Sequence, residues 1–458
     1  MAVQRRLIDR LTAPLVHFME RYYPDLYLFI ILMTLITFAS AWFFADYSPQ
    51  NILLSWGDSL SDILAFSMQM ALMVMISHAL AHTDSVQRIL HRIGSLPQSQ
   101  WQAYSLVLFS VGVICFVSWP LGIIAGGLLA KKVAESAVER GMKIHYPLLV
   151  AGAFGGNVIW HMGYSASAPL FVATANHSMV DQLGVIPITE TVFTAWNLGL
   201  AAAVLLGLTV LVAFLRPVDE DVIELRIDAS EYKDEPLSLT DTHRPVARLE
   251  NSRLVTVIIG VIFLSYLVVR FSQQGFSLNL NVVNWSFLTL TLLLCRSTRH
   301  FMHLVERSAI AAGPMIIAYP FYAGMIGIMT DSGLATMMST WFAEIATAQT
   351  LPLVAFLCAM VINLFIPSGG AQWMVQGPIF VEAANSMGVE QPLIVMAVAY
   401  GDQLTNLIQP LSAIPLLALA GLRLKHIMGY AFILFLAAFV ILGTGFALVC
   451  FSQDGNIA

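Results

Sequence analysis

The chain has 458 residues, of which 58% are hydrophobic and only 11% are charged. An ordinary soluble domain has about a quarter of its residues charged, so this composition excludes a soluble globular protein and predicts a polytopic membrane protein. The net charge of −6 indicates little by itself, because in membranes the distribution of charge matters more than its sum.

The first 22 residues place arginines among leucines and lack the uninterrupted apolar core of a signal peptide. We expect an amphipathic helix on the membrane surface in this stretch.

The stretch 216–251 is a soluble-looking linker with ten acidic residues, typical of a solvated cytoplasmic connector rather than a binding tail for a basic partner. We expect an all-α fold. About nine segments are long and apolar enough to span a bilayer as helices, namely 26–44, 62–82, 147–175, 189–215, 252–271, 282–297, 313–330, 391–419 and 428–451.

Two further segments, 101–135 and 351–385, are predicted to be re-entrant hairpins. In the second, prolines, glycines and glutamines fill the stretch 363–378, in the middle of an apolar run. Neither arm beside that stretch reaches the roughly 20 residues that a spanning helix needs. Broken backbone at that depth is tolerated only where protein or a water-filled cavity surrounds it.

The positions of Lys and Arg provide an independent prediction of topology, since these residues concentrate in cytoplasmic loops. With the N-terminus in the cytoplasm and the C-terminus outside, every Lys and Arg except Arg270 falls on the inner side. The same topology puts the hairpin 101–135 on the cytoplasmic side and the hairpin 351–385 on the outer side.

The two halves of the chain repeat at an offset of 247 residues. Thr83-Asp84-Ser85 recurs as Thr330-Asp331-Ser332, and we expect both triplets to begin short surface helices, with Asp84 and Asp331 as N-caps. The first repeat is 23–215 and the second is 282–451. The helix 252–271 connects the linker to the second repeat. Five spans separate equivalent points, and an odd number inverts the second copy, as in many secondary transporters. The other matching pairs, some after a slip of two residues, include Pro120 with Pro367, Gly122 with Gly369, Asn157 with Asp402, and Ser167 with Ser412.

The repeat also predicts a partner for each hairpin. The stretches 155–169 and 401–415 concentrate glycine, proline and polar side chains inside otherwise apolar spans. A continuous lipid-facing helix would not accommodate them. We therefore expect two helices unwound mid-membrane, within 147–175 and 391–419, each facing its own hairpin tip.

Three motifs together resemble the short-chain fatty acid transporter family over essentially the whole chain. They are Pro-Ser-Gly-Gly-x-Gln-Trp-x-x-Gln-Gly-Pro at 367–378, Gly-Asp-Gln-x-Thr-Asn-x-x-Gln-Pro at 401–410, and Trp-His-x-Gly-x-Ser-x-Ser-Ala-Pro at 160–169. That family is similar in plan to a larger ion-transporter group of elevator-type carriers. The resemblance implies uptake of small monocarboxylates such as butyrate or acetoacetate in a bacterial inner membrane, symport with Na⁺ or H⁺, and a transport domain that slides along a homodimeric scaffold.

No Lys or Arg lies at the predicted midplane, so a carboxylate there would need half-helix ends, hydroxyl and amide donors, a bound cation or a protonated histidine. We expect no other cofactor than the coupling ion. The candidate cation-coupling residues are Asn157, Asp402 and Ser412, with a possible Na⁺ near the first two, because hard cations prefer oxygen ligands. The candidate substrate-binding residues are Ser118, Trp119, His161, Ser165, Ser167, Ser368, Gly369, Gly370, Gln372, Trp373, Gln376, Thr405, Asn406 and Gln409.

Each of these assignments has a structural alternative. Asp402 is a cation ligand or proton carrier, or else an acid that caps the helix after the break. His161 contacts the carboxylate or carries a proton, or else it is a neutral histidine bound to backbone. Trp119, Trp160, Trp373 and Met374 line a pocket for a short alkyl chain, or else they only pack.

Other classes of function fit the sequence less well. An intramembrane enzyme is disfavoured, because no Gly-x-Ser-x-Gly elbow and no zinc-type spacing of histidines occurs. A channel is disfavoured, since no ring of charge lines the predicted path. A dicarboxylate or other organic-anion carrier of the same fold is the closer alternative, although two carboxylates would need more positive charge. The four cysteines lie in apolar segments and are expected to be buried and free.

Overall fold

The computed structural model describes residues 14, 16–19, 21–24, 26–174, 177, 179–217, 222–225, 245–275 and 280–452. Within these ranges all regular structure is helical, which confirms the predicted all-α class. Residues 1–13 and most of the linker lie outside the described ranges, so the surface helix and the connector stay predictions there. Val16, which is described, packs against Gly429.

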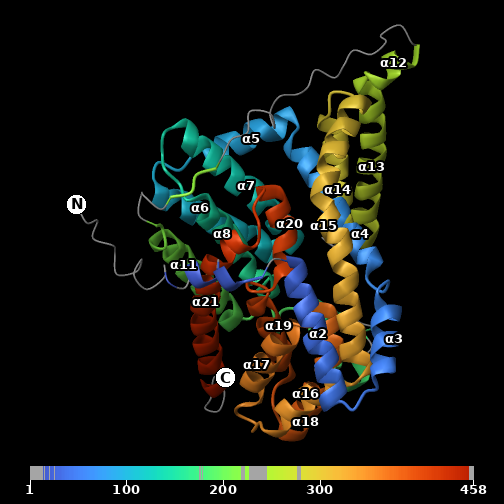
Figure 1. Ribbon diagram of the computed structural model, residues 1–458, viewed down its shortest axis with the longest axis vertical. Helices are drawn as coiled ribbons and strands as arrows, with labels where there is room; N and C mark the ends of the chain where they lie inside the picture. Colours follow the sequence, from blue (N-terminus) through green and yellow to red (C-terminus); the bar gives the residue numbers. More distant parts are fainter. Residues whose placement is uncertain are drawn as a thin grey trace, which may run out of the picture.

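Six helices form a bundle along one side of the molecule, here called the flanking bundle (Figure 1). α15 is 34 residues long, or about 51 Å at 1.5 Å per residue, and runs the length of this bundle. The sequence indicated a span only at 313–330, because charged residues before it hide the helical continuation from a hydropathy criterion. The members of the flanking bundle are α2 (Leu26–Phe44), α3 (Pro49–Ser59), α4 (Leu64–Ala81), α13 (Arg253–Gln274), α14 (Leu280–Leu294) and α15 (Thr298–Asp331).

The remaining long helices form the core bundle, which holds the largest buried apolar cluster. α21 (Lys425–Ser452) and α11 (Ala195–Phe214) pack on each other along its side. α11 begins later than the predicted span 189–215, since Thr194 caps it by accepting a hydrogen bond from the Asn197 N–H. Its other members are α6 (Gln100–Val117), α7 (Trp119–Glu139), α8 (Tyr146–Gly156), η1 (Asn157–Met162), α9 (Ser167–Val172), α17 (Leu351–Asn363), α18 (Gly369–Met387), α19 (Gln391–Thr405) and α20 (Pro410–Ala420).

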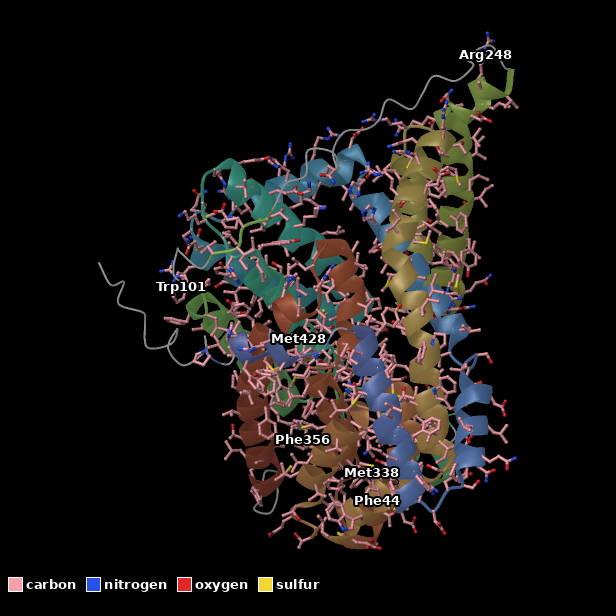
Figure 2. The ribbon with its side chains drawn as sticks, in the orientation of Figure 1. Phe44, Trp101, Arg248, Met338, Phe356 and Met428 are labelled. Atoms are coloured by element: carbon pink, nitrogen blue, oxygen red, sulfur yellow. The ribbon has the colours of Figure 1, made fainter. Side chains whose placement is uncertain are left out.

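The same order of elements occurs in both halves of the core bundle. In the first half, the helix pair α6–α7 is followed by the broken helix α8–η1–α9. In the second half, the helix pair α17–α18 is followed by the broken helix α19–α20. The two pairs lie at opposite ends of the molecule (Figure 1). In Figure 2, Arg248 of α12 (Pro245–Glu250) marks the end nearer α6 and α7, whereas Phe44 and Met338 lie near the end with α17 and α18.

The two Thr-Asp-Ser triplets do not adopt the same structure. Thr83, not Asp84, is the N-cap residue of α5 (Asp84–Gly94), and Asp84 is its first helical residue. Asp331 is the last residue of α15, and Gly333, with φ of 71°, separates it from α16 (Leu334–Glu344). Both predicted N-cap assignments are therefore wrong. Asp84 instead pairs with Arg296, from the connection between α14 and α15, at 2.6 Å and 3.0 Å.

Among the described residues, five helices are long and apolar enough to cross a membrane, or six if the bent pair α19–α20 counts as one span. Shorter apolar helices within 67–81, 281–294 and 351–363 accompany them. The predicted number of nine spans stays a prediction. α3 and the short helix α10 (Val180–Leu183) were not predicted. The cysteines are buried and free, as expected.

Candidate functional site

The tip of the helix pair α17–α18 presents the start of a helix to the middle of the molecule. α17 ends at Asn363 and α18 begins at Gly369. Ser368 is the N-cap residue in an extended conformation, but its side chain makes no capping hydrogen bond. The first N–H groups of a helix have no acceptor within it and give that end a partial positive charge. The tip can therefore donate hydrogen bonds to an anion without any basic side chain.

The break between α19 and α20 faces this tip. The two helices are bent by 49° across residues 406–409. Pro410 begins α20, where its missing N–H costs no hydrogen bond. Gln409 caps the helix, because its Oε1 accepts from the Leu411 N–H at 2.6 Å. The cap after the break is thus Gln409 and not Asp402, the alternative that the sequence left open.

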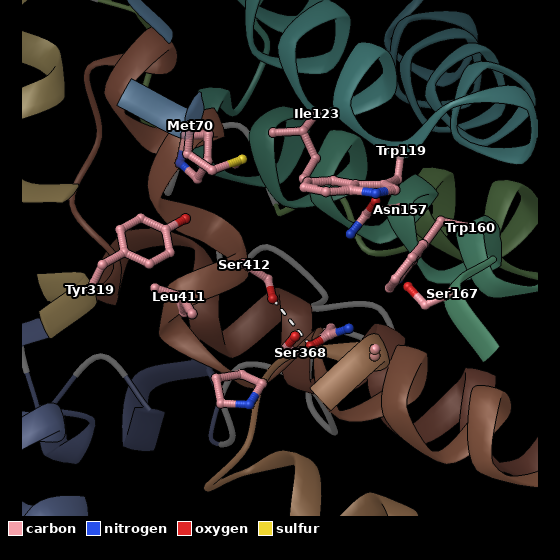
Figure 3. A pocket seen from close by; sticks show the side chains of 15 residues that line it. Met70, Trp119, Ile123, Asn157, Trp160, Ser167, Tyr319, Ser368, Leu411 and Ser412 are labelled. Carbon is pink, nitrogen blue, oxygen red and sulfur yellow. Dashed lines mark hydrogen bonds between the residues drawn. The ribbon is translucent and has the colours of Figure 1, made fainter. Parts of the chain in front are cut away.

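A cavity of about 140 Å³ lies where the tip meets the break (Figure 3). None of the described residues that line it is charged. Ser368 and Ser412 lie together on one side, and Met70, Ile123 and Trp119 lie across the cavity from them (Figure 3). The cavity is therefore polar at the end with the two serines and mainly apolar at the other, where Asn157 and Tyr319 are the polar side chains (Figure 3). Its lining consists of Met70, Trp119, Ile123, Asn157, Trp160, Ser167, Tyr319, Pro367, Ser368, Gly369, Gly370, Asn406, Leu411, Ser412 and Pro415.

Asn363 connects the tip to the broken helix. Its Nδ2 lies 2.9 Å from the Asp402 carbonyl oxygen and from Thr405 Oγ1, and 3.0 Å from Asn406 Oδ1. An amide nitrogen has two hydrogens, so these three acceptors share two donors. Asn406 Nδ2 donates to Asp402 Oδ1 at 3.0 Å, and Asn406 Oδ1 accepts from Ser412 Oγ at 3.2 Å. Hydrogen bonds thus run from the cavity wall at Ser412 to the Asp402 carboxylate.

Asp402 and His161 lie behind the cavity wall, where the two halves meet. Asp402 is 1% exposed, its Oδ2 has no partner among the described residues, and its Oδ1 lies 3.7 Å from His161 Nδ1. That Nδ1 lies 2.9 Å from the carbonyl oxygen of Ala399, which can only accept, so Nδ1 carries a proton and Nε2 is the acceptor of the neutral ring. Nε2 is buried without a partner and faces the tip, since a Cβ added at Gly369 would lie 2.6 Å from it.

The first half supplies a second tip with different chemistry. The Trp119 N–H, at the start of α7, donates to Ser165 Oγ at 3.0 Å, so Ser165 is used to hold this tip. Ser118 is fully buried, and its hydroxyl has no partner among the described residues. Trp119 and Trp160 flank the cavity with ring centroids 5.7 Å apart. Trp160 also packs on the His161 ring.

The predicted site residues divide into two groups. Those that line the cavity are Trp119, Asn157, Ser167, Ser368, Gly369, Gly370, Asn406 and Ser412. Those outside the lining are Ser118, His161, Ser165, Gln372, Trp373, Gln376, Asp402, Thr405 and Gln409. A role in substrate or cation binding stays a prediction for all of them.

Gln372 and Gln376 of α18 turn toward α17, and none of Gln372, Trp373 and Gln376 lines the cavity. Gln372 Nε2 donates to the Ala359 carbonyl oxygen and to Gln376 Oε1, both at 2.8 Å. Gln376 Nε2 lies 3.2 Å from Cys358 Sγ, and Trp373 is fully buried. These side chains brace the helix pair, because the turn of α18 directs both glutamines to α17.

Several lining residues carried no signal in the sequence. Met70 and Tyr319 come from α4 and α15 of the flanking bundle, and Ile123 and Leu411 are ordinary apolar residues of α7 and α20. Gln403 was also missed: its Oε1 accepts from the His161 N–H at 3.1 Å. Its place beside Asp402 in the Gly-Asp-Gln motif was the only signal that could have indicated it.

The described residues contain no group of three or more His, Cys, Asp or Glu that could hold a metal ion. Asp402 Oδ1 accepts a hydrogen bond from Asn406 Nδ2 and lies 3.7 Å from His161 Nδ1. Asn157 lies in the cavity lining, whereas Asp402 lies behind it. A Na⁺ site near these two residues stays a prediction.

Comparison with known proteins identifies the family. Residues 7–449 match the family described as short chain fatty acid transporter. The chain belongs to this family. It is therefore a multi-pass membrane transporter and not an enzyme, which confirms both predictions.

Two curated relatives, each provisionally named a short-chain fatty acid transporter, match almost the full chain. The relative from Escherichia coli K12 is 34% identical over 446 residues, covering 96% of this chain and 100% of the relative. The relative from Haemophilus influenzae is 31% identical over 456 residues, with the same coverage of each.

Among solved structures, the YdaH transporter of Alcanivorax borkumensis matches with a TM-score of 0.44 and 16% identity, covering 93% of this chain and 99% of that one. MtrF of Neisseria gonorrhoeae, whose structure is described as illuminating a class of antimetabolite efflux pumps, matches with a TM-score of 0.38 and 15% identity, covering 97% of each chain.

Proposed function

We propose that the protein takes up short-chain monocarboxylates, such as butyrate or acetoacetate, by cation-coupled symport. The observation that carries this proposal is the uncharged cavity between the tip and the break, polar at one end and mainly apolar at the other. Its volume of about 140 Å³ is close to the roughly 150 Å³ of an engineered cavity that holds one benzene molecule. A four-carbon acid such as butyrate has as many non-hydrogen atoms as benzene and therefore fits such a space.

The polar end supports recognition of one carboxylate. The start of α18 offers N–H groups and a partial positive charge, and Ser368, Asn406 and Ser412 add side-chain donors. A second carboxylate would be pressed against the wall of Met70 and Ile123, where the Asn157 amide and the Tyr319 hydroxyl offer fewer donors than the start of α18 and no charge compensates it. This contrast favours monocarboxylates over dicarboxylates.

Asp402 is the proposed carrier of the coupling charge, whether Na⁺ or H⁺. It is a fully buried carboxylate that hydrogen bonds through Asn406 to Ser412 at the cavity wall. A cation or proton at Asp402 would offset the charge of a bound anion through this short chain. Ionisable groups inside membrane-spanning segments are expensive to bury and commonly have such a role.

We also propose alternating access by an elevator movement of the core bundle along the flanking bundle. The polar end of the cavity belongs to the core bundle. Where the core bundle contacts α2, α4 and α15 of the flanking bundle, the side chains form an apolar cluster. An apolar surface of this kind favours sliding. Homodimeric assembly through the flanking bundle is part of this proposal.

Reconstitution into proteoliposomes tests the transport function. We expect saturable uptake of labelled butyrate, accelerated by an inward Na⁺ or proton gradient and inhibited by acetoacetate but not by succinate. Ser368→Ala, in the cavity lining, should weaken uptake, whereas Ser386→Ala, exposed on the same helix, should not. Uptake of succinate without competition by butyrate would exclude the monocarboxylate function.

A further inference from the structure

The apolar end of the cavity is built by side chains from both bundles. Met70 of α4 is 2% exposed and belongs to one buried cluster with Tyr319 of α15 and Leu411 of α20. Ile123 of α7 is also 2% exposed and lies beside Trp119 in the lining. Figure 3 shows Met70 and Ile123 across the cavity from Ser368 and Ser412.

A linear acid bound in this cavity has one favourable orientation. Its carboxylate meets the donors at Ser368 and Ser412, and its alkyl chain extends to the opposite wall. The reverse orientation would remove the carboxylate from the start of α18 and leave it among mainly apolar side chains with only Asn157 and Tyr319 as donors, which is costly. The last carbon of the chain therefore meets Met70 and Ile123.

We propose that Met70, together with Ile123, sets the longest acyl chain that the transporter accepts. This inference rests on the proposed monocarboxylate function and specifies its substrate range. Trp119 lies beside Ile123 on the same wall, but its backbone N–H is bound to Ser165 Oγ and its ring lies against Trp160, so it is the fixed part of this wall, and Trp160 packs on the His161 ring. Met70 ends the cavity with a flexible thioether side chain, packed against neighbours from the flanking bundle.

The limit on acyl chain length depends on residues from both bundles. The donors for the carboxylate are carried by α18 and by the region from Asn406 to Ser412, whereas Met70 belongs to α4. An acid too long for the cavity would press Met70 and separate the two bundles at their shared apolar surface. Long chains should therefore bind weakly rather than bind and remain untransported.

Competition against labelled butyrate in proteoliposomes tests the proposal, with unlabelled acetate, butyrate, hexanoate and octanoate as competitors. Met70→Ala removes Cγ, Sδ and Cε and opens the end wall. Each further methylene group buried should then improve binding by about fourfold. We expect the inhibition constant of hexanoate, relative to that of butyrate, to fall by about 15-fold in Met70→Ala, with a smaller fall in Ile123→Ala. Met70→Phe should do the opposite and weaken butyrate more than acetate.

Met68→Ala is the matched control, since Met68 lies on the same helix, is 48% exposed and does not line the cavity. Its ratio of hexanoate to butyrate inhibition should equal that of the unmodified protein. The proposal is overturned if Met70→Ala and Ile123→Ala transport butyrate with unchanged ratios. Should Met70→Ala not fold, Ile123→Ala and Met70→Phe decide the question. Failure of the unmodified protein to transport butyrate would instead overturn the proposed function, and this inference with it.

Discussion

A methyl group at Gly369 is expected to displace the tip of α18. An added Cβ would lie 2.5 Å from His161 Cε1 and 3.1 Å from Ser167 Cβ, where ordinary contact begins at 3.4 Å. The tip or the ring must therefore move by about 0.9 Å. The ring cannot turn freely, because its Nδ1 is bound to the Ala399 carbonyl oxygen. Overpacking of this kind costs about 1–3 kcal/mol.

Since the tip forms one wall of the cavity, we expect Gly369→Ala to weaken butyrate binding by about 5- to 150-fold, at about 1.4 kcal/mol for each factor of ten. The assay is the concentration dependence of butyrate uptake in proteoliposomes with equal amounts of folded protein. Gly370→Ala is the matched control, because nothing lies within 4 Å of its added Cβ. It should leave stability unchanged and weaken uptake far less than Gly369→Ala.

A double-mutant cycle tests whether the contact itself is responsible. In a His161→Ala background only the milder approach to Ser167 Cβ at 3.1 Å remains, so Gly369→Ala should cost less there. Strictly additive effects of the two substitutions, or normal uptake by Gly369→Ala alone, would refute the close approach between the tip and His161.

Three further outcomes are expected. Asp402→Asn keeps the size of the side chain but removes its charge, so a Na⁺ or proton gradient should no longer accelerate butyrate uptake. Exchange of labelled for unlabelled butyrate should continue. Gradient-driven uptake in this variant would exclude Asp402 as the carrier of the coupling cation or proton. Hydrogen bonds from Arg296 hold the pKa of Asp84 below its usual range, so the stability this ion pair contributes is present above about pH 4 and is lost as the pH falls through the lowered pKa. Because both side chains are more than half exposed, Asp84→Asn should cost at most about 1 kcal/mol at pH 7 and nothing near pH 2, measured as the difference in thermal stability. Tyr23→Phe removes the hydrogen bond to the Ile408 carbonyl oxygen in the break and should destabilise the protein by about 1 kcal/mol; an unchanged melting temperature would contradict the role of this contact.

The sequence predicted the interruptions in the apolar segments well. The tip before Gly369 and the break at 406–409 both fall where glycine, proline and polar residues occur together. This signal is local, because a proline or a missing side chain changes the backbone at its own position. The all-helical class and the family could be predicted for a similar reason, since composition and contiguous motifs carry them.

The identical triplets at Asp84 and Asp331 show where local reasoning fails. One begins a surface helix and the other ends the long helix α15. The difference is not in the triplets but in what precedes them, because α15 is a continuous helix whose last turns pack against α3. N-cap preference is worth about 1 kcal/mol, and the packing of a long helix readily exceeds it.

Only the tertiary structure decided which polar residues face the cavity. Gln372 and Gln376 looked equivalent to Ser368 in the sequence, but the turn of α18 directs them to α17, where they brace the helix pair. Met70 and Tyr319 line the cavity although they are distant in the chain and carry no polar signal. The sequence by itself therefore determined where the backbone breaks and which family the chain belongs to. The residues that surround a substrate were decided by packing, because they depend on which helix faces lie against one another across the two bundles.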